Sequence, residues 1–321
     1  MSGVLLIGMD IGGTSTRVTV TGSNGERAGF GTASGGNPTS HGGAAAATAI
    51  RTALGQALTG LDPSHVRAGV VGLAGFGRFQ VDPAASAAFH AAWAEAGLDA
   101  PVRVVADSLV AFVAGTEAAS GTVLVGGTGA VAAAVADREL GRIADGHGWL
   151  LGDLGGGYWI GREAVRATLA AVDAGRPSTP LTRHVLTEIL GHDRIAPVPR
   201  HTVNALVGAV NLRPPVELAR YAPLVTRAHE AGDPVATDIV TRAAAHLVDT
   251  VAAVRHGDPT APIVLAGSVV TGDTAVAVQV KKDLSARWPA APLCPARDGA
   301  AAAAWLAALD LGIHLPHPAA A

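Results

Sequence analysis

The chain has 321 residues, 49% hydrophobic and 15% charged, which is more apolar material than one core usually holds, so two domains are expected. Its 23 Lys and Arg against 26 Asp and Glu give a net charge of −3, and without a basic stripe or many aromatic residues this excludes a nucleic acid as the expected partner. Cys294 is the only cysteine, which excludes a disulfide framework, a cysteine zinc site and an iron–sulfur cluster held by one chain.

The first predicted element is a buried strand that begins at Val4 and ends in Asp10. A corner of Gly12, Gly13 and Thr14 follows it. Adjacent glycines permit a tight turn, and they leave backbone N–H groups open to phosphate oxygens. Asp10 is placed to hold a divalent cation. The alternative is an ordinary hairpin with a glycine-rich turn.

The next part of the first domain alternates strands and helices. Strands are predicted over 16–21, 26–32, 66–72 and 102–105, a polar loop over 33–43, and helices over 44–58, 82–96 and 109–118. Asp82 and Pro83 are typical of an N-cap and a first helical residue. Asp107 lies just beyond the last of these strands.

The order of elements then repeats about 115 residues later. An apolar run over 121–125 is followed by a second glycine corner, 126–129, and by apolar runs over 130–136 and 140–144. The uncharged window 118–136 contains Ser, Thr and glycine and favours strand–turn–strand over a membrane helix. Two similar α/β halves would place their glycine corners across a cleft.

The second half carries a helical insertion. Helices are predicted over 155–174, within 177–225 with breaks at prolines, over 233–257, 275–288 and 299–309, and strands over 262–266 and 292–295. The segment before Val4 has no basic stretch followed by an apolar one, so no signal peptide is expected. The prediction is a cytoplasmic protein that contacts neither membrane nor nucleic acid.

Several polar or glycine-rich segments fall at predicted strand ends, the edge where open α/β sheets bind ligands. They are Asp10–Thr14, Leu73–Arg78, Asp107, Gly126–Gly129 and Gly267–Ser268. One glycine corner is weak evidence. Two corners in repeated contexts favour a nucleotide site.

These motifs resemble those of the sugar kinase, Hsp70 and actin superfamily. The corner Asp10–Arg17 is similar to its first phosphate loop, Gly126–Gly129 to its second, and Leu265–Val269 to its adenosine segment. Gly148–Asp153 followed by Tyr158–Gly161 resembles the BadF/BadG/BcrA/BcrD group, which contains N-acetylglucosamine kinase. The resemblance runs from about Leu6 to about Ala308.

The resemblance implies an α/β fold of duplicated actin-like (ribonuclease H-like) domains with a ligand cleft between them. The domains would be 1–117 and 118–321, with the last helix able to pack back on the first. It implies ATP and Mg²⁺, with Asp10 holding the metal and a set of residues binding the nucleotide: Gly12, Gly13, Thr14, Arg17, Gly127, Thr128, Gly129, Gly267 and Ser268. The alternative for Arg17 is an exposed strand residue.

The resemblance also identifies Asp107 as the catalytic base that takes the proton from the sugar hydroxyl. The alternative is an N-cap for the helix predicted from Leu109. Sugar-binding roles are implied for Asn37, Asp107, Thr128, Gly146, His147, Gly148 and Asp153. Asn37 could instead belong to a turn before Pro38, and Asp153 could cap the next helix.

Two positions depart from the family pattern. Family members commonly carry Trp where His147 stands and Glu where Leu154 stands. These departures leave the identity of the sugar undetermined. The expected function is an ATP-dependent kinase for the 6-hydroxyl of N-acetylglucosamine or glucosamine, acting as a homodimer. The alternatives are a kinase of another hexose or N-acetylated sugar, and an inactive nucleotide- or sugar-binding regulator. The dehydratase activators of this family need paired cysteines, which Cys294 alone does not supply.

Overall fold

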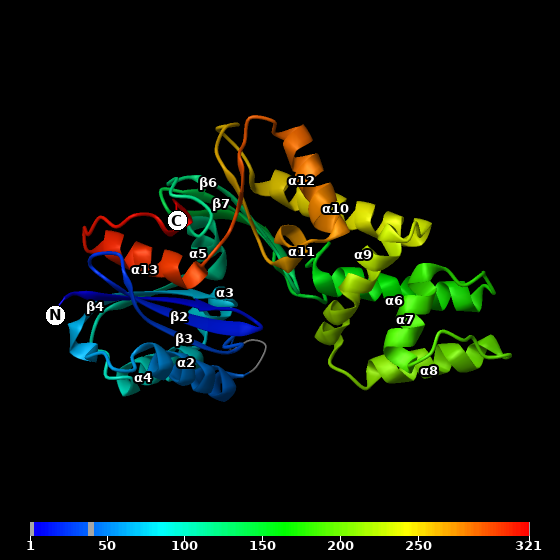
Figure 1. The fold of residues 1–321 in the computed structure, drawn as a ribbon, viewed down its shortest axis with the longest axis horizontal. Helices are drawn as coiled ribbons and strands as arrows, with labels where there is room; N and C mark the ends of the chain where they lie inside the picture. Colours follow the sequence, from blue (N-terminus) through cyan, green and yellow to red (C-terminus); the bar gives the residue numbers. More distant parts are fainter. Residues whose placement is uncertain (1–2, 38–41, 321) are drawn as a thin grey trace. The chain divides into compact units, whose positions relative to one another are not determined.

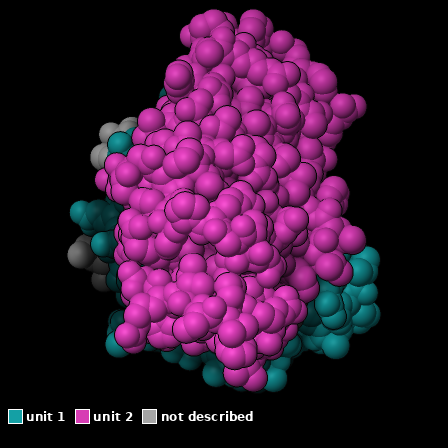
Figure 2. Space-filling view, turned by 90° about the vertical axis from the view of Figure 1, so that its right-hand side faces the viewer, with its two compact units in different colours: residues 1–119, 135–139, 294–321 teal, residues 120–134, 140–293 magenta. Residues whose placement is uncertain are grey.

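The computed structural model describes residues 3–37 and 42–320; part of the predicted polar loop, 38–41, lies outside this range. The chain divides into two compact units, coloured separately in Figure 2. Unit 1 comprises Met1–Ala119, Val135–Glu139 and Cys294–Ala321, and unit 2 comprises Ser120–Ala134 and Leu140–Leu293. Compared with the predicted division at 117 and 118, unit 1 also includes the C-terminal segment.

Unit 1 is built on a five-stranded sheet of order β3-β2-β1-β4-β5. Its strands are β1 (Leu5–Ile11), β2 (Ser15–Gly22), β3 (Arg27–Ser34), β4 (Val66–Leu73) and β5 (Val102–Ala106). β2 is antiparallel to β1 and to β3, whereas β4 is parallel to both β1 and β5. β1 and β4 are nearly continuous apolar runs because both faces of the central sheet are covered.

The helices of unit 1 cover the two faces of this sheet (Figure 1). They are α2 (Gly43–Ala57), α3 (Phe76–Val81), α4 (Pro83–Glu95), α5 (Asp107–Val113) and α13 (Gly299–Asp310), with 3-10 helices η1 (Pro63–His65) and η3 (Pro318–Ala320). α2 packs on β2 and β3, and α13 packs on β1, β2 and β4. A Cβ at Gly8 would overlap the backbone of Ala300 and Ala304, so glycine in β1 lets α13 approach closely.

Unit 2 repeats this plan. Its sheet has the order β10-β9-β6-β7-β8, formed by β6 (Gly121–Gly126), β7 (Ala130–Ala136), β8 (Glu139–Asp145), β9 (Ile263–Ala266) and β10 (Leu293–Pro295). In both sheets three consecutive strands are followed by two strands added later in the chain, and β9 is parallel to β6 as β4 is to β1. The predicted duplication is confirmed.

The insertion of unit 2 is helical. Its elements are α6 (Gly157–Asp173), α7 (Pro180–Leu190), α8 (Pro199–Asn211), η2 (Pro215–Tyr221), α9 (Ala222–Glu230) and α10 (Pro234–Val254), followed by α11 (Ser268–Thr271) and α12 (Ala275–Arg287). Several begin at a proline, whose missing N–H costs nothing in the first turn. The apolar faces of α6, α7, α9, α10 and α12 form one core with the sheet.

The bounds of two predicted helices are corrected. The helix predicted over 109–118 is α5, which begins at Asp107 with Ala106 as its N-cap. It ends early, and the carbonyl of Ala114 accepts a hydrogen bond from Arg297 N (3.1 Å). The helix predicted to reach Gly257 ends at Val254, because the guanidinium of Arg255 turns inward to bond Ala261 O (2.7 Å).

The short helices α3 and α11 overlap the predicted strand-end segments 73–78 and 267–268, where the sequence predicts no helix. At six and four residues they are too short to show a periodic pattern. No helix within the described residues is long and apolar enough to cross a membrane.

Candidate active site

Two acidic side chains of unit 1 lie at the carboxyl edge of its sheet. Asp10 of β1 is in register with Gly72 of β4, and β4 in turn aligns Leu73 with Ala106 of β5, directly before Asp107. One strand therefore separates the ends that carry the two carboxylates. This edge is the ligand-binding edge of open α/β sheets.

Burial and neighbouring charges raise the pKa of Asp10 to about 6. Burial is the largest cause, followed by repulsion from Asp107; Arg17 acts in the opposite direction and Asp298 adds further repulsion. Arg17 lies opposite Asp10 in the β1–β2 register. Asp298, the N-cap of α13, was not predicted, and its neighbour Gly299 approaches so closely that a Cβ would meet the Asp10 carboxylate at 2.7 Å.

Asp107 opens α5, and its Oδ1 accepts a hydrogen bond from Ser108 N at 2.9 Å. Burial raises the pKa of this carboxyl, and the backbone hydrogen bond partly offsets the effect. A carboxylate with a raised pKa is suited to accept a proton, because its proton affinity lies nearer that of a hydroxyl group under attack.

The first glycine corner leaves space on its open side. Gly12 N donates to Ser15 O at 2.9 Å, so this N–H closes the corner and is not a free phosphate donor as predicted. A Cβ at Gly13 would meet nothing within 4 Å, and its backbone does not require glycine. Thr14 is exposed. The fold therefore does not explain glycine at position 13, whereas a closely bound ligand would.

The loop that carries Asn37 lies beside this corner. A Cβ on Gly36 would overlap Thr16 Oγ1 (2.6 Å) and Ile11 Cγ2 (2.9 Å), and Thr16 Oγ1 donates to Ser34 O at 2.9 Å. The sheet end therefore holds the start of the loop, and brings Asn37 near the corner.

The second glycine corner, in unit 2, is held by the start of α6. Gly157 N donates to Gly127 O (2.8 Å) and Tyr158 N to Thr128 O (2.9 Å), while Gly127 N bonds Gly129 O (2.9 Å). A Cβ at Gly127 would meet nothing within 4 Å, as at Gly13. Both corners therefore combine a fixed backbone with an open side.

Gly267 and Ser268 lie against this second corner. Gly267 has a φ of 87°, which other residues seldom adopt, and a Cβ there would meet Gly126 O at 2.5 Å. Both the backbone conformation and the lack of space therefore require glycine. Ser268 follows as the first residue of α11. The predicted adenosine segment and second phosphate loop thus meet within unit 2.

The predicted sugar segment of unit 2 also meets the corner. Gly146 N donates to Ala130 O at 2.9 Å, and the Asp153 carboxylate lies against Gly129. Burial raises the pKa of Asp153, and hydrogen bonds from the backbone of Ala130 and Gly148 oppose this. His147 is largely exposed, 3.7 Å from a second acidic residue, Asp145, that sequence reasoning missed.

No three His, Cys, Asp or Glu side chains converge as a metal cage among the described residues. Mg²⁺ commonly uses one or two carboxylates together with substrate phosphates and water, so it does not need such a cage. Asp10 offers the oxygen donor that Mg²⁺ prefers, next to a corner open on one side. The donor set therefore fits Mg²⁺ brought with a nucleotide.

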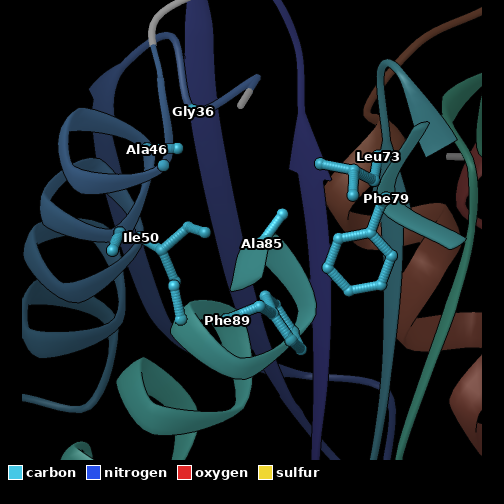
Figure 3. Close-up of a pocket in the computed structure, with 10 residues that line it drawn as sticks. Gly36, Ala46, Ile50, Leu73, Phe79, Ala85 and Phe89 are labelled. Atoms are coloured by element: carbon cyan, nitrogen blue, oxygen red, sulfur yellow. The ribbon is translucent and has the colours of Figure 1, made fainter. Parts of the chain in front are cut away.

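Two cavities of unit 1 do not include the predicted site residues. One, of about 20 Å³, is lined by apolar residues that include Ile50, Phe79 and Phe89 (Figure 3). Its volume is about that of one water molecule, but its lining offers few polar groups to bond a water. Such a cavity is typical of a packing void. The other, of about 450 Å³, lies beside α3, α4 and β5 and is lined in part by Gln80 and His90.

Comparisons with known proteins place the chain among sugar kinases and related ATPases by similarity. The chain is 30% identical to the N-acetyl-D-glucosamine kinase of Dictyostelium discoideum over 199 residues, 59% of this chain and 61% of that kinase, and so spans about three fifths of its length. It is 25% identical to the glucosamine kinase of Vibrio cholerae over 252 residues, 78% and 80% of the two chains.

A solved structure from Chromobacterium violaceum, provisionally named an N-acetylglucosamine kinase, superposes with a TM-score of 0.75 and 24% identity, covering 95% of this chain and 99% of that one. This similarity supports the fold, which is that of duplicated actin-like domains. The model of the BadF/BadG/BcrA/BcrD ATPase family matches residues 7–307, so the chain belongs to that family.

Proposed function

We propose that the protein is an ATP-dependent amino-sugar kinase that phosphorylates the 6-hydroxyl of N-acetylglucosamine or glucosamine. The observation that carries this proposal is Asp107 with its raised pKa on the same sheet edge as Asp10 and the open corner at Gly13. Relatives named for both sugars support the substrate class.

In this proposal the two glycine corners bind the ATP phosphates. Gly13 and Thr14 of unit 1 and Thr128 and Gly129 of unit 2 are the proposed phosphate-binding residues. Gly12 and Gly127 shape the two corners, because their N–H groups bond Ser15 O and Gly129 O.

Gly267 and Ser268 bind the adenosine part, and Arg17 offsets negative charge beside Asp10. Asp10 would hold Mg²⁺, which supplies charge neutralisation to the phosphates when bound.

The proposed sugar-binding residues of unit 1 are Asn37 and Asp107. Those of unit 2 are Thr128, Gly146, His147, Gly148 and Asp153. The carboxyl of Asp107 accepts the proton of the 6-hydroxyl while that oxygen bonds to the γ-phosphorus and ADP leaves. Such a reaction depends on positioning and charge stabilisation more than on covalent chemistry.

A coupled ADP-release assay tests this function. The acceptors are glucose, glucosamine, N-acetylglucosamine, N-acetylmannosamine and N-acetylmuramic acid, with a sugar-free reaction as the control. N-acetylglucosamine or glucosamine is expected to give the highest kcat/KM. Stimulation by another sugar alone would replace the proposed substrate, and ATP binding without turnover on any sugar would favour the inactive regulator.

The proposal also includes a homodimer, as the family resemblance implies, and the cytoplasm as the place where it acts. Light scattering coupled to size-exclusion chromatography tests the dimer, with a monomer mass of 31.9 kDa as the reference. A mass near that value would remove this part of the proposal and leave the reaction in place.

A further inference from the structure

The loop between β8 and α6 contains the sugar segment of the proposed function, and one buried carboxylate joins its two ends. Asp145 precedes the loop, and its Oδ1 accepts from Asp153 N at 2.6 Å. Its Oδ2 accepts from Leu154 N at 2.9 Å. The Asp145 side chain is 10% exposed, whereas that of His147 is 67% exposed.

This bonding pattern closes the loop on itself. The chain leaves β8 at Asp145, passes through Gly146, His147 and Gly148, and returns at Asp153 to the same carboxyl group. A third and longer hydrogen bond to Asp145 Oδ1 comes from His147 N at 3.5 Å. Hydrogen bonds to an ionised acceptor are stronger than neutral ones, and removing the carboxylate would take this acceptor from all three N–H groups. Asp145 is therefore the main polar connection between the beginning and end of this loop.

The backbone of the loop is shaped around this carboxyl. Asp145 and Asp153 have φ of 62° and 58°, a left-handed conformation that residues other than glycine seldom adopt. A Cβ at Gly152 would overlap Asp145 Oδ1. The strain at two positions and the required glycine are consistent with a loop held in one conformation by its polar contacts.

The loop also contacts the second glycine corner, through Asp153. Asp153 places its carboxylate against Gly129 and receives hydrogen bonds from the backbone of Ala130 and Gly148. Asp153 O also accepts from Gly156 N at 3.1 Å, next to the start of α6. A displacement of the Asp153 backbone would therefore move both the sugar segment and the contact with Gly129.

We propose that Asp145 is a positioning residue that fixes Gly146–Gly148 and Asp153 in the conformation that binds the sugar. This inference rests on the proposed kinase function. Asp145 does not touch the sugar, because its two oxygens are directed to the loop backbone. It acts on sugar affinity through Asp153, and it leaves the ATP-binding residues of unit 1 unchanged.

The test compares Asp145→Ala and Asp145→Asn with the wild type in the full-length protein. Asp145→Ala is expected to raise the KM for the sugar at least tenfold and the KM for ATP by less, because Asp153 also contacts Gly129 of the second glycine corner. Asp145→Asn keeps one acceptor oxygen, so its KM for the sugar should lie between those of the wild type and Asp145→Ala. Asp258→Asn is the matched control, because Asp258 also accepts a loop N–H, from Thr260 at 2.8 Å, away from the site.

Hydrogen exchange provides a readout that does not need activity. The amides of Asp153 and Leu154 are expected to exchange at least tenfold faster in Asp145→Ala than in the wild type, and at unchanged rates in Asp258→Asn. Unchanged exchange in Asp145→Ala, or an equal rise of both KM values, would overturn the positioning role.

The two proposals fail in different ways. A wild-type protein that phosphorylates no sugar overturns the proposed function, and the sugar-positioning role with it, whatever the exchange rates. An active wild type whose sugar KM is unaltered by Asp145→Ala overturns the role of Asp145 alone.

Discussion

Asp107 is the residue on which the proposed chemistry depends most directly. Asp107→Asn keeps the size of the side chain and the acceptor for Ser108 N, so α5 and sugar binding should be retained. The amide cannot take the hydroxyl proton, and kcat is expected to fall by about 10²–10⁴. Steady-state kinetics and sugar titration by calorimetry measure the two effects separately. A variant with near-normal kcat would remove Asp107 from the base role.

A different prediction concerns Asp10, because its raised pKa means that the ionised carboxylate destabilises the folded protein. The folded pKa of about 6 lies above the unfolded value of 3.8, so the ligand-free protein loses stability as pH rises between them. Asp10→Asn should therefore stabilise the ligand-free protein by up to about 3 kcal/mol at pH 8, with the gain vanishing below about pH 4.

Urea unfolding at several pH values measures this gain, and kinase activity should be lost in the same variant. A gain that is independent of pH would contradict the assignment of the cost to ionised Asp10.

A substitution at Gly13 should affect ligand binding without affecting the stability of the fold. Gly13→Ala adds a methyl group into open space and should leave the melting temperature nearly unchanged. If phosphates occupy that space, the KM for ATP should rise at least tenfold. Gly55→Ala in α2 is the control, since its Cβ also meets nothing, and it should stabilise the helix by about 0.5–1 kcal/mol with no change in KM. Unaltered ATP kinetics in Gly13→Ala would argue against the phosphate site.

Part of the site could be predicted from single residues. Asp10 and Asp107 follow apolar runs, so their places at strand ends can be inferred from local pattern alone. Asp298 could not be found in this way, because it reaches Asp10 only when α13 packs on β1. Asp145 ends a strand, as many surface residues do. Its hydrogen bond from Asp153 N forms only when the loop folds back, which local pattern does not show.

At the scale of elements, caps and prolines made the helix starts predictable. Asp82 accepts hydrogen bonds from Ala84 N and Ala85 N, as its position before Pro83 predicts. Helix ends were less predictable, because tertiary contacts determine them. α5 ends where Ala114 O bonds Arg297, a residue from the far end of the chain.

Asp233 tests how much such a cap contributes when it also joins two helices. It is buried and accepts from Val235 N and Ala236 N in α10 and from Leu181 N in α7 at 2.7 Å. Asp233→Ala should destabilise the protein by about 2–4 kcal/mol, because the cap is lost and a buried N–H loses its partner.

Asp82→Ala is the control for Asp233, because Asp82 caps only its own helix and is only partly buried, and the expected loss is about 1 kcal/mol. Urea unfolding compares the two variants. Equal losses would mean that the bond between α7 and α10 adds nothing.

For the whole molecule, the repeat of two glycine corners predicted the duplication, and the two sheets share one strand order. What local pattern did not determine was the composition of unit 1, which includes Cys294–Ala321. That packing requires Gly8 in β1 to meet α13, a contact between segments at opposite ends of the chain. Duplication gives each unit one glycine corner, and the proposed function assigns phosphate binding to both corners.

The most direct test of that transfer is ³¹P NMR of the product formed from ATP, Mg²⁺ and N-acetylglucosamine or glucosamine. A phosphate on the 6-oxygen couples to two protons, so the proton-coupled spectrum should contain a new phosphomonoester triplet that grows as ATP is consumed and is absent with Asp107→Asn. Inorganic phosphate as the sole new signal, or a doublet from a phosphate on a ring carbon, would contradict a kinase of the 6-hydroxyl.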